Sequence, residues 1–319
     1  MKNKHLGINV VIKFIKIDQV NKAIQALENL NVDWIRIEFD FFEYLKNKKL
    51  NYELYDNFLK KVLKSKIKVL GLISGKVPGN LMNLIDPKRK YPFVLDKLTE
   101  YKNFLNILIL RYKKYINHWE IWNEENSLRF WINLPSPKEY LKLLSISSEI
   151  IKTQQKSAKI VFGGIMGDDR KKLIFFQYLN FFKDSCKNKT KKLFDVTNFH
   201  PYDFDCYLSF KSAKSFFRKY EKIFLDTINY SRKYSNKKIF FTEFGISRKF
   251  TKFTNKEIAK IYFDLLKLCE QEKVVLFLWT LVGPYGFEYS CLNPETEFCL
   301  LNKKMEPLPL YKELKKKFI

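Results

Sequence analysis

The sequence is poor in the residues that build metal centres and covalent cross-links. Its 319 residues include only three histidines and five cysteines, and no Cys-x-x-Cys pair occurs. The cysteines are odd in number and widely scattered along the chain. This composition disfavours a zinc site and a disulfide framework, and it is typical of a reducing compartment. We therefore expect no metal and no cofactor.

Long apolar runs and targeting signals are also missing. No stretch approaches the roughly 18 consecutive apolar residues that a membrane-spanning helix needs. The N-terminal segment is basic and then apolar, but Lys13, Lys16 and Asp18 interrupt it, and no small-residue cleavage site follows. We expect a chain without a membrane span that resides in the cytoplasm, or one that is secreted if a leader has been removed. The sequence does not indicate an oligomeric state.

Acidic residues and arginine are scarce beside lysine. The formal net charge is +25, with 59 basic and 34 acidic residues, yet only eight of the basic residues are arginines. Lysine, asparagine, isoleucine, phenylalanine and tyrosine are abundant together, which AT-rich codon usage explains without any ligand. Arginine is the residue suited to bidentate phosphate and base contacts. We therefore interpret the charge as a solvated lysine surface and expect no nucleic-acid partner, while an anionic glycan stays open as a substrate.

The chain does contain a regular alternation of short apolar runs and longer amphipathic stretches. Apolar residues recur at helical spacing between the runs, for example at Leu54, Phe58, Leu59, Val62 and Leu63. Strands that alternate with helices pair in parallel through crossover helices, and eight such units are typical of a (β/α)8 barrel. The prediction is an α/β fold with one barrel domain over residues 1–319. The apolar runs lie at residues 6–11, 33–39, 68–73, 118–122, 159–163, 195–200, 238–244 and 274–279.

A doubly wound open sheet is the rival fold. The count of eight runs and the absence of a Gly-x-Gly-x-x-Gly turn after the first run weaken it. The longest insertions all follow the carboxyl ends of predicted strands, which is the face where barrels carry their active sites. Tyr285 and Phe287, in the last insertion, are candidates for lining a subsite. The insertions span residues 74–92, 166–172, 203–215 and 282–297.

Two predicted strands end in a glutamate. The fourth leads into Asn123-Glu124, and the seventh contains Thr242-Glu243. A carboxylate at the mouth of a barrel is costly unless it is paired or solvated. Glycoside hydrolysis requires a proton donor for the leaving oxygen and a second carboxylate facing the anomeric carbon, about 5 Å apart in retaining enzymes. Because the fourth and seventh strands lie on opposite sides of an eight-stranded barrel, the two carboxylates could meet across its mouth.

Several motifs occur together in one strand order. They are Trp122-Asn123-Glu124, residues 198–202 (Asn-Phe-His-Pro-Tyr), residues 242–245 (Thr-Glu-Phe-Gly), Trp279 and the tail at residues 300–311. Together they resemble clan A of the glycoside hydrolases, in particular family 39 and its relatives, with family 5 close to them. The resemblance covers nearly the whole chain. It implies a retaining O-glycosyl hydrolase that cleaves β-glycosidic bonds of an oligo- or polysaccharide by double displacement.

The resemblance also implies a role for each matching residue. Glu124 would protonate the glycosidic oxygen and later deprotonate the incoming water, and Glu243 would attack the anomeric carbon. Asn123 would hydrogen-bond the 2-hydroxyl of the sugar. Tyr202 and Arg36 would hold Glu243 ionised, because hydrogen bonds and positive charge both favour a carboxylate.

Three further side chains complete the expected site. His200 would bind a sugar hydroxyl or orient Glu124, and Trp279 would form the platform under the sugar ring, with a cis peptide bond to the next residue. Trp131 follows the fourth predicted strand and is a candidate for lining a subsite. The family often has proline after the strand-four glutamate, whereas this chain has Glu125. We assign the acid to Glu124 because it follows the asparagine.

Other roles stay open for several of these residues and for the whole chain. Arg36 would equally well pair with Glu120 or Glu38, and Trp34 and Trp119 are expected to pack against helices. A glycan-binding barrel without turnover, a transglycosylase on the same scaffold and a charge-driven nucleic-acid binder are the alternative functions. A glycan panel, product analysis at high acceptor concentration and the salt dependence of binding would discriminate among them.

Overall fold

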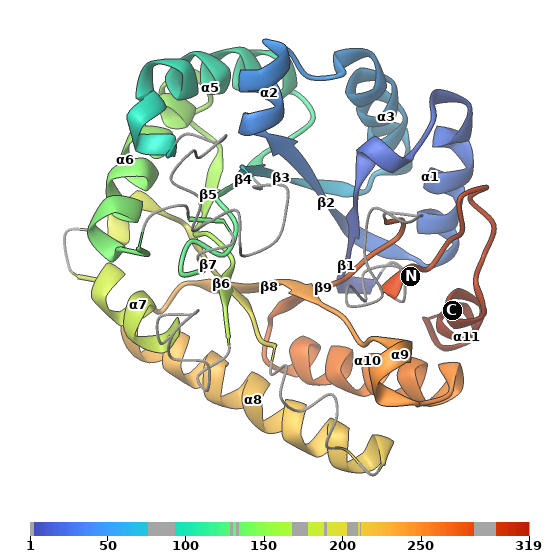
Figure 1. The fold of residues 1–319 in the computed structure, drawn as a ribbon. Coiled ribbons are helices and arrows are strands. Elements are labelled where there is room, and N and C mark those ends of the chain that lie inside the picture. Colours follow the sequence, from blue (N-terminus) through green and yellow to red (C-terminus); the bar gives the residue numbers. More distant parts are fainter. Residues whose placement is uncertain are drawn as a thin grey trace.

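The computed structural model describes residues 3–75, 93–127, 130–131, 134–167, 178–187, 190–202, 210, 212–283 and 298–318. Its strands are β1 (Asn3–Val10), β2 (Val32–Asp40), β3 (Lys68–Ser74), β4 (His118–Ile121), β5 (Lys159–Val161), β6 (Ile165–Met166), β7 (Val196–His200), β8 (Lys238–Phe244) and β9 (Val275–Leu278). All pairings between these strands are parallel, and β5 pairs with β7 while β9 pairs with β1, so the sheet closes into a barrel (Figure 1). The short strand β6 continues the chain beyond β5 and pairs with β7.

The helices form an outer layer around the strands (Figure 1). They are α1 (Val20–Asn29), α2 (Phe41–Asn47), α3 (Tyr52–Ser65), α5 (Leu98–Tyr112), α6 (Pro137–Gln154), α7 (Tyr178–Ser185), α8 (Ala213–Tyr234), α9 (Arg248–Thr251), α10 (Asn255–Gln271) and α11 (Pro309–Phe318). The predicted (β/α)8 barrel is confirmed. Leu301 and Pro307 form an antiparallel bridge directly before α11, as expected for the closing hairpin. Within the described residues, no helix combines the length and apolar character that crossing a membrane needs.

Polar side chains mark the starts of the long helices. Asn51, Ser136 and Ser212 each accept a backbone N–H from the first turn of α3, α6 and α8. Thr254 and Glu257 form a capping box at the start of α10. Each cap satisfies an N–H group that has no partner within its helix and contributes about 1 kcal/mol. Helix α3 therefore begins at Tyr52, just before the apolar periodicity that starts at Leu54.

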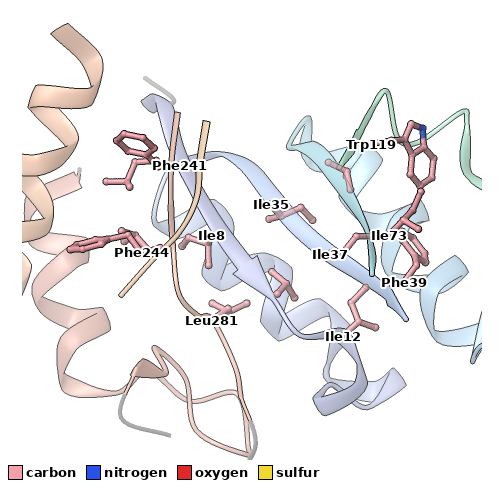
Figure 2. Packing of buried hydrophobic residues seen from close by; sticks show 14 of the residues in the cluster. Ile8, Ile12, Ile35, Ile37, Phe39, Ile73, Trp119, Phe241, Phe244 and Leu281 are labelled. Carbon is pink, nitrogen blue, oxygen red and sulfur yellow. The ribbon is translucent and has the colours of Figure 1, made fainter. Parts of the chain in front are cut away.

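Outward-facing strand residues pack between the barrel and the helices. On β2, Ile35, Ile37 and Phe39 are fully buried in this layer (Figure 2). Trp119 of β4 belongs to the same layer, with its ring centroid 6.0 Å from that of Phe39, as expected for a residue that faces helices. Successive strand residues point to opposite faces, so the residues between them face the barrel interior.

The barrel interior is apolar near the amino ends of the strands, away from the glutamates. Trp34 lies there, with its ring 5.4 Å from Phe240 of β8 and 6.4 Å from Phe277 of β9. Since β1 separates β2 from β9, these contacts cross the inside of the barrel. The expectation that Trp34 packs against helices is therefore wrong. This interior layer comprises Trp34, Leu70, Val161, Val196, Phe240, Val275 and Phe277.

Strand β8 contains an irregularity that governs its interior face. Phe241 pairs with Leu276 of β9, but Phe244 pairs with Leu278, so β8 advances three residues while β9 advances two. Phe241 and Phe244 both point toward the outer helices, where they pack on Phe224 of α8 at 4.8 and 5.2 Å (Figure 2). The two residues between them, at positions 242 and 243, therefore both face inward. Such β-bulges commonly re-aim a side chain beside an active site.

Candidate active site

Two glutamates face each other across the mouth of the barrel. Glu124 follows the end of β4, and Glu243 is the penultimate residue of β8. One carboxylate oxygen of each lies within 4.8 Å of the other and of a ring nitrogen of His200. The side chain of Glu124 is 6% exposed and that of Glu243 is 15% exposed. The two carboxyl groups therefore share one site that is shielded from bulk water without being sealed.

The chain turns sharply after β4 to present this site. Trp122 and Glu124 have φ angles of 71° and 47°. For a residue other than glycine, this left-handed backbone conformation costs about 1–3 kcal/mol. The N–H of Trp122 donates to the carbonyl of Ile73 at 2.8 Å, and that of Glu124 donates to the carbonyl of Gly164 at 3.0 Å. Hydrogen bonds to β3 and to Gly164, between β5 and β6, thus hold Asn123 and Glu124 in a geometry that a regular strand would not give.

A buried ion pair between Arg36 and Glu120 lies next to the carboxylate of Glu243. Arg36 donates through Nε and Nη2 to the two oxygens of Glu120 at 2.8 and 2.9 Å. It also donates to Asn9 at 3.0 Å and to Asn123 at 2.6 Å. Burial lowers the pKa of Arg36, but the charges of Glu120 and Glu243 outweigh burial and raise the pKa above its ordinary value. Arg36 is therefore a fixed cation, and it orients Asn123 as well as pairing with Glu120.

The environment of Glu243 favours its ionised form. The hydroxyl of Tyr202 donates to Oε1 of Glu243 at 3.2 Å. Nη1 of Arg36 lies 3.6 Å from Oε2 of the same carboxylate. A hydrogen-bond donor and a positive charge both stabilise a carboxylate relative to the protonated acid. The structure thus places Tyr202 and Arg36 in the contacts that the sequence predicts for them.

His200 connects the two sides of the site. Its Nδ1 lies 3.2 Å from Oε1 of Glu124, and its Nε2 lies 3.0 Å from the hydroxyl of Thr242. Burial lowers the pKa of His200 to about 4, with Glu243 opposing the shift and Arg36 adding to it. The imidazole is therefore neutral near pH 7. Of the two predicted roles for His200, the contact with Glu124 is present.

Glu125 does not reach the site. Its side chain is fully buried, and neither carboxyl oxygen has a hydrogen-bond partner in the described part of the chain. Burial raises the pKa of Glu125 well above its ordinary range, and the charges of Glu120 and Glu124 raise it further. Glu125 therefore keeps its proton to a higher pH than an ordinary glutamate does. Of the two adjacent glutamates, Glu124 is the one that faces Glu243.

The two tryptophans proposed as sugar contacts have different surroundings. Trp279 follows β9 and is half-buried, and its peptide bond to Thr280 is cis, as expected. Trp131 is 0% exposed, and its ring packs edge-on against Trp122 at 6.1 Å. A ring without accessible surface offers no face to a sugar. The prediction that Trp131 binds substrate is therefore replaced by a packing role behind Trp122.

A pair of glycines beyond β5 makes room for two of these side chains. A Cβ on Gly163 would lie less than 3.0 Å from the carboxyl of Glu125, and a Cβ on Gly164 would lie less than 3.0 Å from the imidazole of His200. Real Cβ atoms essentially never approach other atoms so closely. Glycine at position 164 is thus part of what places His200 against Glu124.

Glu124, His200 and Glu243 also offer three atoms of the kinds that bind metal ions. However, the guanidinium of Arg36 lies 3.6 Å from Glu243, so a cation there would meet a fixed positive charge. The fixed charge of Arg36 therefore disfavours a cation at this position. The candidate subsite residues Tyr285 and Phe287 lie outside the described residues.

Three residues of the site were given no role by sequence reasoning, although two of them, Asn198 and Thr242, lie within the motifs named above. Asn9 of β1 donates to the carbonyl of Thr242 at 2.9 Å. Asn198 of β7 donates to Glu120 at 2.8 Å and accepts from the hydroxyl of Thr242 at 2.9 Å. All three are buried, at 2% exposure or less. Buried asparagine and threonine inside apolar strands are the signal that could have revealed them, because such groups need partners.

Fold and site together define a (β/α)8 barrel that carries two close glutamates at the carboxyl ends of β4 and β8. No protein-family model and no curated protein sequence matches the chain. Solved structures do match it. A family 39 glycoside hydrolase from the gut symbiont Bacteroides cellulosilyticus WH2 aligns with a TM-score of 0.66 and 16% identity, covering 98% of this chain and 63% of that protein.

Two further structures have the same fold. A β-galactosidase from the psychrophilic Marinomonas ef1 aligns with a TM-score of 0.67 and 12% identity, covering 99% of this chain and 58% of that one. A hyperthermostable endo-1,4-β-D-mannanase from Thermotoga petrophila RKU-1 aligns with a TM-score of 0.66 and 14% identity, covering 98% and 99%. The chain thus spans less than two thirds of the first two proteins. These neighbours confirm the predicted (β/α)8 barrel, and at identities of 12–16% the likeness is one of fold.

Proposed function

We propose that this chain is a retaining β-glycosidase that hydrolyses an oligo- or polysaccharide by double displacement. The observation that carries the proposal is the approach of one oxygen of Glu124 and one of Glu243 to within 4.8 Å. Retaining glycosidases hold their carboxyl groups about 5–5.5 Å apart, whereas inverting enzymes need roughly 6.5–9.5 Å to admit a water. The short separation favours retention.

In the first step Glu243 attacks the anomeric carbon. The bond from that carbon to the glycosidic oxygen breaks, its electron pair stays on the oxygen, and the oxygen takes the proton of Glu124. Tyr202 and Arg36 support this step because they keep Glu243 ionised. The product is a glycosyl ester on Glu243 and an ionised Glu124. Asn123, which Arg36 orients, is the proposed partner of the sugar 2-hydroxyl.

In the second step water attacks the anomeric carbon from the face that the leaving group has vacated, opposite the ester bond to Glu243. Glu124, now a carboxylate, takes a proton from the water, and the electron pair of the ester bond returns to Glu243. Two inversions restore the original configuration of the sugar. The need for one protonated and one ionised glutamate gives a bell-shaped dependence of kcat/KM on pH.

The proposed substrate is a β-linked sugar polymer or oligomer. Trp279 is half-buried, its backbone N–H donates to the carbonyl of Phe244 next to Glu243 at 2.8 Å, and it is the proposed platform under the sugar ring. The names of the structural neighbours, a β-galactosidase and an endo-1,4-β-mannanase, support the β configuration. Hydrolysis is proposed over transfer to a second sugar, and the partner of the chain is a carbohydrate and not a nucleic acid.

A panel of aryl β-glycosides and β-linked polysaccharides tests the proposal, with wild type compared with Glu243→Ala and Glu124→Ala. Loss of the acid is expected to lower kcat/KM on a poor leaving group by about 10²–10⁴-fold and to matter less for an activated aryl leaving group. Loss of Glu243 is expected to abolish turnover of both substrates. Glu28→Ala, on the exposed face of α1, is the matched control and should behave as wild type.

Azide separates the two roles. Glu243→Ala with azide should yield the α-glycosyl azide, because azide replaces the nucleophile, whereas Glu124→Ala should yield the β-azide. Undiminished activity in Glu243→Ala would exclude Glu243 as the nucleophile. Binding of a glycan without any product from wild type would favour a binding barrel instead.

A further inference from the structure

The hydroxyl of Thr242 lies between the buried ion pair and the candidate acid. Its Oγ1 is 2.9 Å from Oδ1 of Asn198, 3.2 Å from Oε1 of Glu120 and 3.0 Å from Nε2 of His200. The other ring nitrogen of His200, Nδ1, is 3.2 Å from Oε1 of Glu124. All five side chains are buried. A chain of hydrogen bonds therefore runs from Glu120 through Thr242 and His200 to Glu124.

Two of the three neighbours of Thr242 can only accept a hydrogen bond. Glu120 is a carboxylate that pairs with Arg36. Asn198 directs its amide nitrogen to Glu120 at 2.8 Å, so its oxygen is the atom that faces Thr242. The hydroxyl has one hydrogen, which goes to one of these two acceptors. The neighbour left to donate to the hydroxyl is Nε2 of His200.

The opposite arrangement leaves acceptors facing each other. If Nε2 of His200 carried no hydrogen, the hydroxyl of Thr242 would have to donate to it. Its lone pairs would then point at the oxygens of Glu120 and Asn198, all within buried surroundings where unpaired polar atoms are costly. His200 is neutral because burial lowers its pKa to about 4, so the ring carries a single hydrogen near pH 7. That hydrogen belongs on Nε2, and Nδ1 keeps a lone pair.

We propose that Thr242 is a positioning residue whose hydroxyl fixes the tautomer of His200, so that Nδ1 accepts a hydrogen bond from the protonated carboxyl of Glu124. The inference rests on the proposed function and deepens it. A lone pair 3.2 Å from Glu124 stabilises the carboxylic acid and repels the carboxylate. The acid form is the one needed in the first step. After Glu124 has lost its proton, the same repulsion makes it a better base for the second step.

Other charges also face this pair. Glu243 approaches Nδ1 of His200 from β8 at 3.9 Å, while Arg36 on β2 and Glu120 on β4 act on the ring through their charges. Ionised Glu243 favours a protonated neighbour, and esterification removes that effect. Replacing Thr242 by valine leaves all of these groups in place. Valine has the same shape as threonine but no hydroxyl, so the substitution isolates the contribution of Thr242.

The tautomer is measured directly by long-range ¹⁵N–¹H correlation spectra of the protein labelled with ¹⁵N-histidine. The chain has three histidines, and the signals of His200 are assigned by elimination with His5→Gln and His118→Gln. Wild type is expected to show a protonated Nε2 and an unprotonated Nδ1. Thr242→Val is expected to move the hydrogen to Nδ1, and Thr242→Ser to restore the wild-type pattern. A protonated Nδ1 in wild type, or an unchanged tautomer in Thr242→Val, would overturn the inference.

Kinetics supply the second readout. With His200 donating from Nδ1, ionised Glu124 gains a hydrogen bond, so the alkaline limb of kcat/KM should move to lower pH by about one unit in Thr242→Val. Thr242→Ser should return the limb to its wild-type position. If Thr242→Val lowered kcat/KM equally at every pH and left the alkaline limb at its wild-type position, Thr242 would have only a structural role, which would contradict the inference. The spectra need no substrate, so a failure of the proposed function and a failure of this inference are distinguishable.

Discussion

Replacing Glu125 by glutamine is expected to stabilise the folded chain, and increasingly so as the pH rises. The carboxyl of Glu125 is fully buried, packs beside Gly163, and has no hydrogen-bond partner in the described part of the chain. Burial therefore raises its pKa well above the ordinary range. Glutamine has nearly the same shape and cannot ionise, so it removes the titration and keeps the packing.

The sign follows from the protons bound in each state. In the unfolded chain Glu125 has an ordinary carboxyl that is ionised above about pH 4.3. In the folded chain it stays protonated until the pH reaches its raised pKa, so folding takes up about one proton between these two values. The stability of wild type then falls with rising pH by at most about 1.4 kcal/mol per pH unit, whereas Glu125→Gln has no such loss. From pH 5 to pH 7 the gap between them widens by at most about 2.7 kcal/mol.

Urea unfolding of wild type and Glu125→Gln at pH 5 and pH 7 measures this gap. Glu28→Gln, at an exposed position on α1, is the control for loss of a negative charge and should show a gap near zero at both pH values. A gap for Glu125→Gln that is the same at pH 5 and pH 7 would refute the reasoning. It would mean that Glu125 is ionised in the folded chain and that some group compensates it.

Two further substitutions probe the support of the site. Arg36→Ala should lower the free energy of unfolding by about 3–5 kcal/mol, because it leaves Glu120 buried and unpaired; a loss below about 1 kcal/mol in urea unfolding would contradict the ion pair. Gly164→Ala should lower both stability, by about 1–3 kcal/mol, and kcat, because its Cβ would displace His200. In a double-mutant cycle, Gly164→Ala should cost less when His200 is already alanine, and strict additivity would argue against the displacement.

The barrel could be predicted from the sequence because each strand is buried on both faces. Such strands appear as short apolar runs, and eight of them separated by helical patterns point to one closed sheet. Glu124 and Glu243 stood out because a carboxylate at the end of an apolar strand needs an explanation. The contact of Tyr202 with Glu243 was implied by the family resemblance, and the pairing of Arg36 with Glu120 was one of two open alternatives; both contacts are present.

What escaped prediction depends on side-chain direction. Simple alternation along a strand does not reveal that Thr242 and Glu243 both face inward, since a bulge separates them from the regular pattern. It also does not reveal whether an aromatic side chain faces helices or the barrel interior, which is why Trp34 was misplaced. Trp131 was assigned by its position after a strand, whereas its burial depends on packing against residues distant in sequence, such as Phe93.

Because of the extra residue in β8, the direction of the Glu243 side chain depends on the number of residues in the strand as well as on their chemistry. A shortened chain, with one residue deleted between Phe241 and Phe244, would restore an even ladder with β9 and keep both phenylalanines against α8. One inward side chain would then stand where two stand now. Such a deletion variant would retain its barrel yet lose either the hydroxyl that contacts His200 or the carboxylate that faces Glu124, so no single substitution at these positions could repair it.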